Sequence, residues 1–103
     1  MWRKWFQAYR VPKLVDDLVK AGVLIDRTRE IDVTPHFEAE LPGATVVLWV
    51  DHPNPGSRFL SDGPRYMVNL HPQRQTLLET DDLDEAILLI ARLLSEGKGL
   101  RLL

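Results

Sequence analysis

Apolar residues between positions 83 and 94 recur at helical spacing and occupy a wide arc. At about 100° per residue they cover roughly 200° of a helix circumference, whereas a helix lying on one sheet needs a stripe of roughly 100°. The spare side of this predicted helix, near Leu88, Leu89 and Leu93, should therefore meet another layer of the chain or a partner. The arc consists of Leu83, Ala86, Ile87, Leu89, Ile90, Ala91, Leu93 and Leu94.

The N-terminus carries a second apolar face, on a predicted short helix over residues 1–10. Four aromatic residues there follow the i, i+3, i+4, i+7 rule: Trp2, Trp5, Phe6 and Tyr9. A compact stripe of this kind is typical of core packing or self-association. A partner groove is the second interpretation, and a nucleic-acid or lipid surface is the third.

A second helix is predicted to begin with Pro12, whose missing N–H costs nothing at the first helical position. Gly22 suits the left-handed position that ends a helix. The short apolar run after it, residues 23–25, is either a brief strand or a hydrophobic contact that follows the cap. One side of the helix is apolar and consists of Val11, Leu14, Val15, Leu18 and Val19.

A period of two over residues 31–41 predicts a strand with one dry and one solvated face. Pro35 favours an edge strand or a bulge. The turn is Pro42-Gly43, and residues 45–51 form the returning strand. The dry face holds Ile31, Val33, Phe37, Ala39 and Leu41, and the solvated face holds Asp32, Thr34, His36, Glu38 and Glu40.

The register of this hairpin decides which side of the returning strand meets solvent. If Leu41 pairs with Ala44, then Val47 and Trp49 share the solvated face with His36. A Pro-Gly turn prefers type II, which suits two-residue hairpins poorly, so a register shifted by one residue stays open. Both faces of the returning strand are apolar, so we expect it to be internal, with something covering each side.

The second half of the chain predicts another hairpin and the C-terminal helix. Residues 52–64 form a loop whose length is typical of functional loops. Strands are predicted over residues 65–70 and 75–79.

Start and stop signals bound the C-terminal helix. Asp81 or Asp82 caps it, and Asp82 with Glu85 resembles a capping box. Gly97 and Gly99 are predicted to end it. The apolar residues 100–103 then form a last strand or a free tail.

This order of elements predicts one α+β domain over residues 1–103. Two N-terminal helices precede an antiparallel sheet of three to five strands, and the C-terminal helix packs on the sheet. Residues 1–11 are set apart as an aromatic and basic interaction element.

Composition narrows the class of protein. Hydrophobic residues make up 45% and charged residues 27%, which are values of a globular domain. The chain has no cysteine, which excludes disulfides and thiolate chemistry. No segment approaches the ~20 apolar residues that span a bilayer. We expect a cytoplasmic protein.

Candidate chemistry is sparse, and we expect no enzyme, catalytic residue, metal or cofactor. The strand order predicts that His52 and His71 lie at opposite ends of the sheet, too far apart to share a metal. The carboxylates of residues 81–85 are explained by a helix start. One alternative remains, a small enzyme or anion-binding protein that uses the 52–64 loop. In it, backbone N–H groups and a guanidinium of Gly56, Ser57 and Arg58 hold an anion.

The uneven distribution of charge supports an alternative function, which is nucleic-acid binding. Net charge is +3 over residues 1–30 and −5 over residues 31–103. Residues 14–25, followed by a hairpin, are similar to the end of a winged-helix domain, which implies a nucleic-acid-binding regulator with the hairpin as wing. Its phosphate contacts would come from Arg3, Lys4, Arg10 and Lys13.

The interpretation that the apolar faces favour is a non-enzymatic protein–protein interaction module, acting as a regulator, inhibitor or accessory subunit. Homodimerisation is its simplest form. The predicted contact residues are the aromatic N-terminal stripe, Trp49 on the sheet, and the spare helix side: Trp2, Trp5, Phe6, Tyr9, Trp49, Leu88, Leu89 and Leu93.

Overall fold

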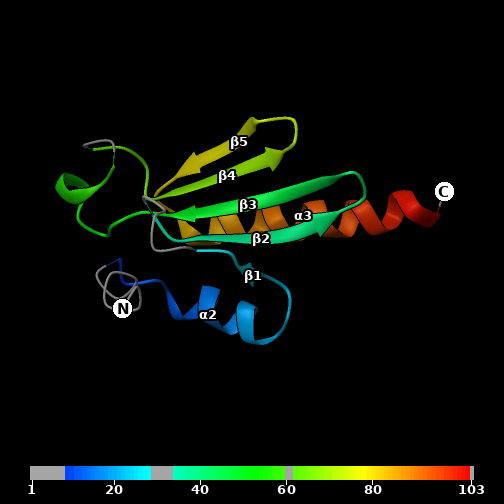
Figure 1. Ribbon diagram of the computed structural model, residues 1–103, viewed down its shortest axis with the longest axis horizontal. Helices are drawn as coiled ribbons and strands as arrows, with labels where there is room; N and C mark the ends of the chain where they lie inside the picture. Colours follow the sequence, from blue (N-terminus) through cyan, green and yellow to red (C-terminus); the bar gives the residue numbers. More distant parts are fainter. Residues whose placement is uncertain (1–8, 29–33, 60–61, 103) are drawn as a thin grey trace.

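The computed structural model describes residues 9–28, 34–59 and 62–102, with side chains described as far as residue 96. It is a small α+β domain with a five-stranded antiparallel sheet (Figure 1). The elements are α2 (Lys13–Lys20), β1 (Ile25–Asp26), β2 (His36–Leu41), β3 (Ala44–Val50), the 3-10 turn η1 (Pro55–Ser57), β4 (Tyr66–His71), β5 (Gln75–Thr80) and α3 (Leu83–Leu102).

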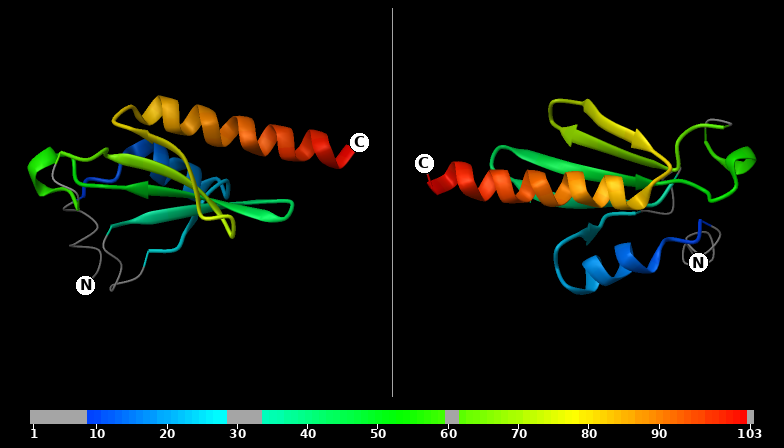
Figure 2. Two further views of the ribbon diagram at one scale, coloured as in Figure 1. Left: turned by 90° about the horizontal axis from the view of Figure 1, so that it is seen from above. Right: turned by 180° about the vertical axis from the view of Figure 1, so that it is seen from behind.

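The strands follow one another across the sheet in chain order, from β1 to β5. Leu41 pairs with Ala44, so the open question of the hairpin register is answered in favour of the two-residue turn. Gly43 has φ +73°, which a glycine adopts without strain. The register places Trp49 opposite His36, as expected for a shared solvated face. β3 is the central strand, which confirms that it is internal, but the described helices cover only one of its two sides (Figure 2).

Helix α2 begins at Lys13, one residue later than predicted, because Pro12 is extended and precedes the first turn. Gly22 ends it as predicted, with φ +79°. The Gly22 N–H donates to the Val19 carbonyl at 3.0 Å, and the Val23 N–H donates to the Leu18 carbonyl at 2.9 Å. These two bonds form a Schellman motif, which satisfies carbonyls that the helix leaves open.

Substitution of Gly22 tests this cap. Gly22→Ala is expected to lower the free energy of unfolding by about 1–2 kcal/mol, because an L residue pays that much in the left-handed region. An added Cβ meets no atom within 4 Å, so the cost is conformational. Urea denaturation measures it. The control is Gly56→Ala, where φ is not positive, and equal losses in both variants would contradict the interpretation.

Both described helices pack on one face of the sheet. Figure 2 shows α3 lying along this face, with α2 beside it near β1. Val15 of α2 and Ala86 and Ile90 of α3 belong to a single buried cluster with the inner residues of the strands. Those strand residues are Phe37, Ala39, Val46, Leu48, Val50, Tyr66 and Val68.

The wide apolar arc of α3 is largely covered by the chain's own core. Leu89 and Leu93 are partly buried and pack against the core cluster, as do Leu83, Ile87 and Leu94. Leu88 is 67% exposed. At 100° per residue it lies opposite the line through Ala86 and Ile90. It is thus a single apolar residue on a solvated side.

The start of α3 confirms one of the two predicted caps. The Asp84 N–H donates to Asp82 Oδ1 at 2.9 Å, so Asp82 is the capping residue. The second bond of the predicted capping box comes from a different residue. The Asp82 N–H donates to Thr80 Oγ1 at 3.0 Å, because Thr80 ends β5 directly before the cap and is nearer than Glu85.

The end of α3 differs from the prediction. The helix continues through Gly97 and Gly99 to Leu102, so the expected stop and the expected terminal strand over residues 100–103 are wrong for residues 100–102. Glycine inside a helix costs only about 1 kcal/mol and leaves its backbone hydrogen bonds intact, so it does not by itself end one. The predicted helix over residues 1–10 falls mostly outside the described residues.

Tyr66 gives the fold a pH-dependent contribution. Burial raises the pKa of the Tyr66 phenol above its ordinary value, against the opposing effect of the Arg65 guanidinium. The pKa of this phenol is higher in the folded protein than in the unfolded protein. The stability that this difference contributes is therefore complete at pH values below the unfolded pKa, and it is lost as the pH rises through the folded pKa. Unfolding free energies measured at increasing pH above about 10 should fall less in Tyr66→Phe than in the wild type. Parallel curves would contradict this assignment.

Candidate functional site

The face of the sheet opposite α3 is the candidate binding surface, and we call it the open face. Trp49 lies at its centre and pairs with His36 of β2 and Met67 of β4. None of the described helices covers this face (Figure 2). The side chains that line its hollows from the three strands are His36, Glu38, Thr45, Val47, Trp49, Met67, Asn69 and His71.

An apolar hollow of about 320 Å³ lies on the open face, and residues of the loop between β3 and β4 contribute to it. This volume is at the lower end of the range of ligand sites, about 300–1,000 Å³. The Oδ1 atom of Asn69 is buried without a hydrogen-bond partner, which costs about 1–3 kcal/mol. The lining residues are Trp49, Phe59, Pro64 and Met67, with Thr34, Asp51, Arg65, Asn69 and His71.

A second hollow of about 300 Å³ adjoins the first through Trp49 and His71. The rings of His36 and Trp49 stack with centroids 4.5 Å apart and planes inclined by 31°. Glu38 Oε2 lies 3.9 Å from His36 Nε2. The two hollows share Trp49 and His71 and together extend across β2, β3 and β4.

Phe59 projects at the rim of the first hollow. It is 70% exposed, more than any other large hydrophobic side chain in the described part of the chain. Arg58, the residue before it, is buried, and only 5% of its side chain is exposed. An aromatic ring thus points outward from a loop that is fixed by a buried guanidinium.

The Arg58 guanidinium bonds to three loop carbonyls and one carboxylate. Its Nε donates to the His52 carbonyl at 2.8 Å, and its Nη2 to the Pro53 carbonyl at 3.2 Å. Its Nη1 donates to the Gly63 carbonyl at 2.7 Å and to Asp81 Oδ1 at 3.0 Å. These contacts tie both ends of the loop to the start of α3.

Asp51 fixes the backbone of Phe59 itself. The Phe59 N–H donates to Asp51 Oδ2 at 3.1 Å, and the His52 N–H donates to Asp51 Oδ1 at 2.7 Å. Asp81 Oδ1 also accepts the Arg65 N–H at 2.8 Å. Because these bonds hold the backbone from His52 to Phe59, Phe59 is presented to a partner at little further entropic cost.

The predicted anion-binding donors are already used within the loop. The Gly56 N–H donates to Asn54 Oδ1 at 3.1 Å, and the Ser57 N–H donates to the Asn54 carbonyl at 3.0 Å. The guanidinium of Arg58 is buried and bonded as above. An anion would have to displace these bonds, so this hypothesis stays a prediction without support from the geometry.

His52 and His71 lie at opposite ends of the β3–β4 ladder, as expected. Thr45 pairs with His71 at one end of the β3–β4 ladder and Val50 pairs with Tyr66 at the other, beyond which lies His52. Among the residues that the structure describes, no three His, Asp or Glu side chains gather closely enough to hold a metal ion.

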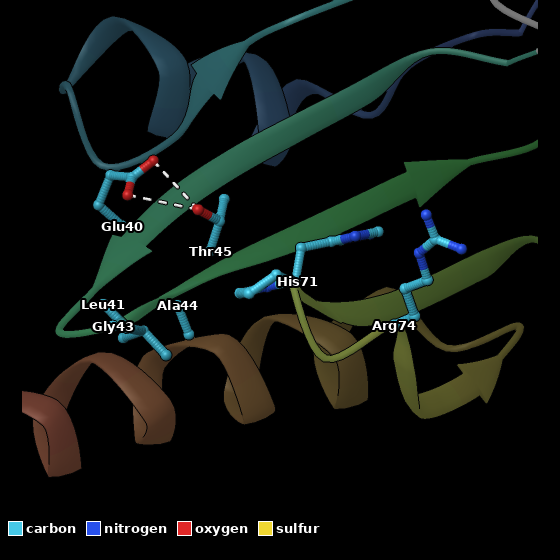
Figure 3. Close-up of a pocket in the computed structure, with 8 residues that line it drawn as sticks. Glu40, Leu41, Gly43, Ala44, Thr45, His71 and Arg74 are labelled. Carbon is cyan, nitrogen blue, oxygen red and sulfur yellow. Dashed lines mark hydrogen bonds between the residues drawn. The ribbon is translucent and has the colours of Figure 1, made fainter.

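A shallower depression of about 700 Å³ lies at the far end of the sheet, beside the β2–β3 turn. Figure 3 shows it with Glu40 and Thr45 on neighbouring strands. The Thr45 hydroxyl donates to both carboxylate oxygens of Glu40, at 3.4 and 3.3 Å. His71 and Arg74 lie on the other side of the depression, and the Arg74 side chain points away from Glu40 (Figure 3). This polar, open surface offers no constellation for catalysis.

The predicted interaction residues are dispersed in the structure. Trp49 lies at the centre of the open face, whereas Leu88 lies on the outer side of α3. Trp2, Trp5 and Phe6 lie outside the described residues, as do Arg3 and Lys4 of the nucleic-acid alternative. Lys13 is ion-paired with Asp17 at 2.9 Å, and the hairpin proposed as a wing is flanked by β1 and β4 within the sheet.

Among the residues of the site that the sequence analysis missed are Phe59 and Met67. Met67 occupies the solvated position between two core residues of β4, so its alternation was available as a signal. Phe59 is a single aromatic residue in a polar loop and has no periodic signal.

Comparison with known proteins adds no assignment: no protein-family model, curated protein or solved structure matches this chain. Neither described helix is both long and apolar enough to cross a membrane.

Proposed function

We propose that this chain is a small non-enzymatic protein–protein interaction module that acts as a regulator, inhibitor or accessory subunit. Its docking surface is the open face, with Phe59 and Trp49 as anchors. The observation that carries the proposal is the contrast between Phe59 and Arg58: an aromatic side chain is 70% exposed on a loop fixed by a buried arginine.

The chemistry of the open face favours a protein partner over a reaction. Aromatic side chains in preorganised positions dominate binding energy at interfaces, because they bury large areas and lose little side-chain entropy. The surface combines Phe59, Trp49 and Met67 with the polar groups of Asn69 and His71. Such a mixture of apolar centre and polar margin is typical of the core and rim of an interface.

The simplest partner is a second copy of the chain, with the two open faces in contact. Sheets that pack face to face lie about 10 Å apart and bury alternate side chains of both. In this arrangement Phe59 of each copy would contact the hollow of the other, which an isologous interface requires.

Light scattering behind a sizing column, at several concentrations, tests this proposal. The wild type is expected to rise in mass towards twice the 11.8 kDa of one chain as concentration increases. Phe59→Ser should raise the dissociation constant roughly a thousandfold, because each dimer loses two central aromatic anchors at about 2 kcal/mol each.

Leu88→Ser is the matched control, since Leu88 is 67% exposed but lies on the other side of the molecule. It should leave the dissociation constant unchanged. An equal effect of both substitutions would contradict the assignment of the open face. A complex whose affinity falls steeply with salt would instead favour the nucleic-acid alternative.

A further inference from the structure

The geometry points to the chain's own first eight residues as an occupant of the apolar hollow on the open face. We propose that Trp2, Trp5 and Phe6 dock there and compete with the partner. These residues lie outside the described residues, whereas the described chain begins beside the hollow. This competition would regulate the docking surface of the proposed function, and it therefore rests on that function.

The described chain begins at the rim of the hollow. Arg65 lines the hollow, and its Nη2 donates to the Tyr9 carbonyl at 3.2 Å and to the Arg10 carbonyl at 2.9 Å. The Tyr9 ring makes an edge contact with His52, with centroids 5.8 Å apart, and His52 follows the lining residue Asp51. The point from which the first eight residues extend is therefore anchored next to the hollow.

The backbone at this anchor is held in an uncommon conformation. Arg10 has φ +47°, although it is not a glycine. The left-handed region costs an L residue roughly 1–2 kcal/mol, and the two bonds from Arg65 offset that cost. The structure thus fixes a sharp change of chain direction just before α2.

Reach and chemistry both permit the docking. An extended chain covers about 3.3 Å per residue, so the tether allows Phe6 to reach up to roughly 10 Å from Tyr9 and Trp2 up to roughly 23 Å. The hollow offers Trp49, Phe59, Pro64 and Met67 as apolar contacts, and the N-terminal stripe is apolar and aromatic in sequence. A tethered segment also acts at an effective concentration in the millimolar range, so it competes well with a separate molecule.

Contacts of the Met67 methyl group test occupancy without any partner. In dilute full-length protein, nuclear Overhauser effects are expected between the Met67 methyl protons and ring protons of Trp2, Trp5 or Phe6. The triple variant Trp2→Ser/Trp5→Ser/Phe6→Ser should shift the Met67 methyl resonance. Phe59→Ser, at the exposed rim, should weaken the same contacts without unfolding the protein.

The matched control is Arg3→Ser/Lys4→Ser/Gln7→Ser, which changes three residues of the same segment and keeps its aromatic stripe. It should preserve the contacts. Absence of any Overhauser effect from Met67 to the segment, with an unchanged Met67 resonance in the aromatic variant, would overturn the inference.

Competition is read from self-association. If the segment occupies the hollow about 90% of the time, its removal should tighten the apparent dissociation constant about a hundredfold, because both copies of the dimer must have a free hollow. An aromatic variant that dimerises no more tightly than the control, while the Overhauser contacts are present, would overturn the competition. If no form of the protein dimerises but the contacts are present, the self-association fails and the docking stands.

Discussion

Arg58→Met is expected to lower the free energy of unfolding by about 3 kcal/mol and to release the loop that carries Phe59. The guanidinium makes four hydrogen bonds in a nearly fully buried position. Hydrogen bonds to a charged group contribute about 1.5–3 kcal/mol each, and they are not additive within one cluster. Methionine keeps the unbranched shape and removes every donor, so the loss reports the bonds and not a cavity.

Urea denaturation measures this loss, and hydrogen exchange of the Phe59 amide measures the release of the loop. Arg92→Met is the control, because Arg92 lies exposed on α3 and methionine has nearly the same helix propensity as arginine. A loss no greater than that of the control would show that the loop is held by other contacts. Faster exchange at Phe59 with weaker dimerisation is the result that links this loop to the proposed function.

Phe37→Ala is expected to lower the free energy of unfolding by about 3–5 kcal/mol. Phe37 is 1% exposed and lies directly opposite Leu48 of the central strand. Truncation of a buried ring removes its transfer free energy and leaves a cavity between the sheet and its helices. Phe37→Leu, which keeps most of the volume, should cost clearly less. Equal losses for the two variants would show that the site collapses freely.

Strand β2 was predictable because its residues alternate with a period of two, and β3 because it returns directly after the Pro-Gly turn. The same alternation placed Trp49 and Val47 on the solvated face with His36, once Leu41 was paired with Ala44. A register shifted by one residue would have moved Val47 and Trp49 to the core side of the sheet. The candidate surface was thus partly accessible to sequence reasoning, through the residues that strands position.

The rest of the fold and of the candidate surface depends on contacts between residues that are distant in the sequence. Arg58 bonds to Asp81, which lies 23 positions away, and no local pattern pairs them. The covering of the α3 arc depends on how far the sheet extends beneath it. The sequence analysis predicted that α3 stops at Gly97, because glycine is common where helices end. Glycine inside a helix costs only about 1 kcal/mol, and α3 continues through it.

We propose that this chain binds through the open face of its sheet. Chemical-shift changes in the 103-residue chain, followed as its concentration is raised, test this proposal. We predict concentration-dependent shifts at Phe59, Trp49 and Met67, with none at Leu88. Shifts confined to the outer side of α3 around Leu88 would contradict the account and move the interface to the opposite side of the molecule.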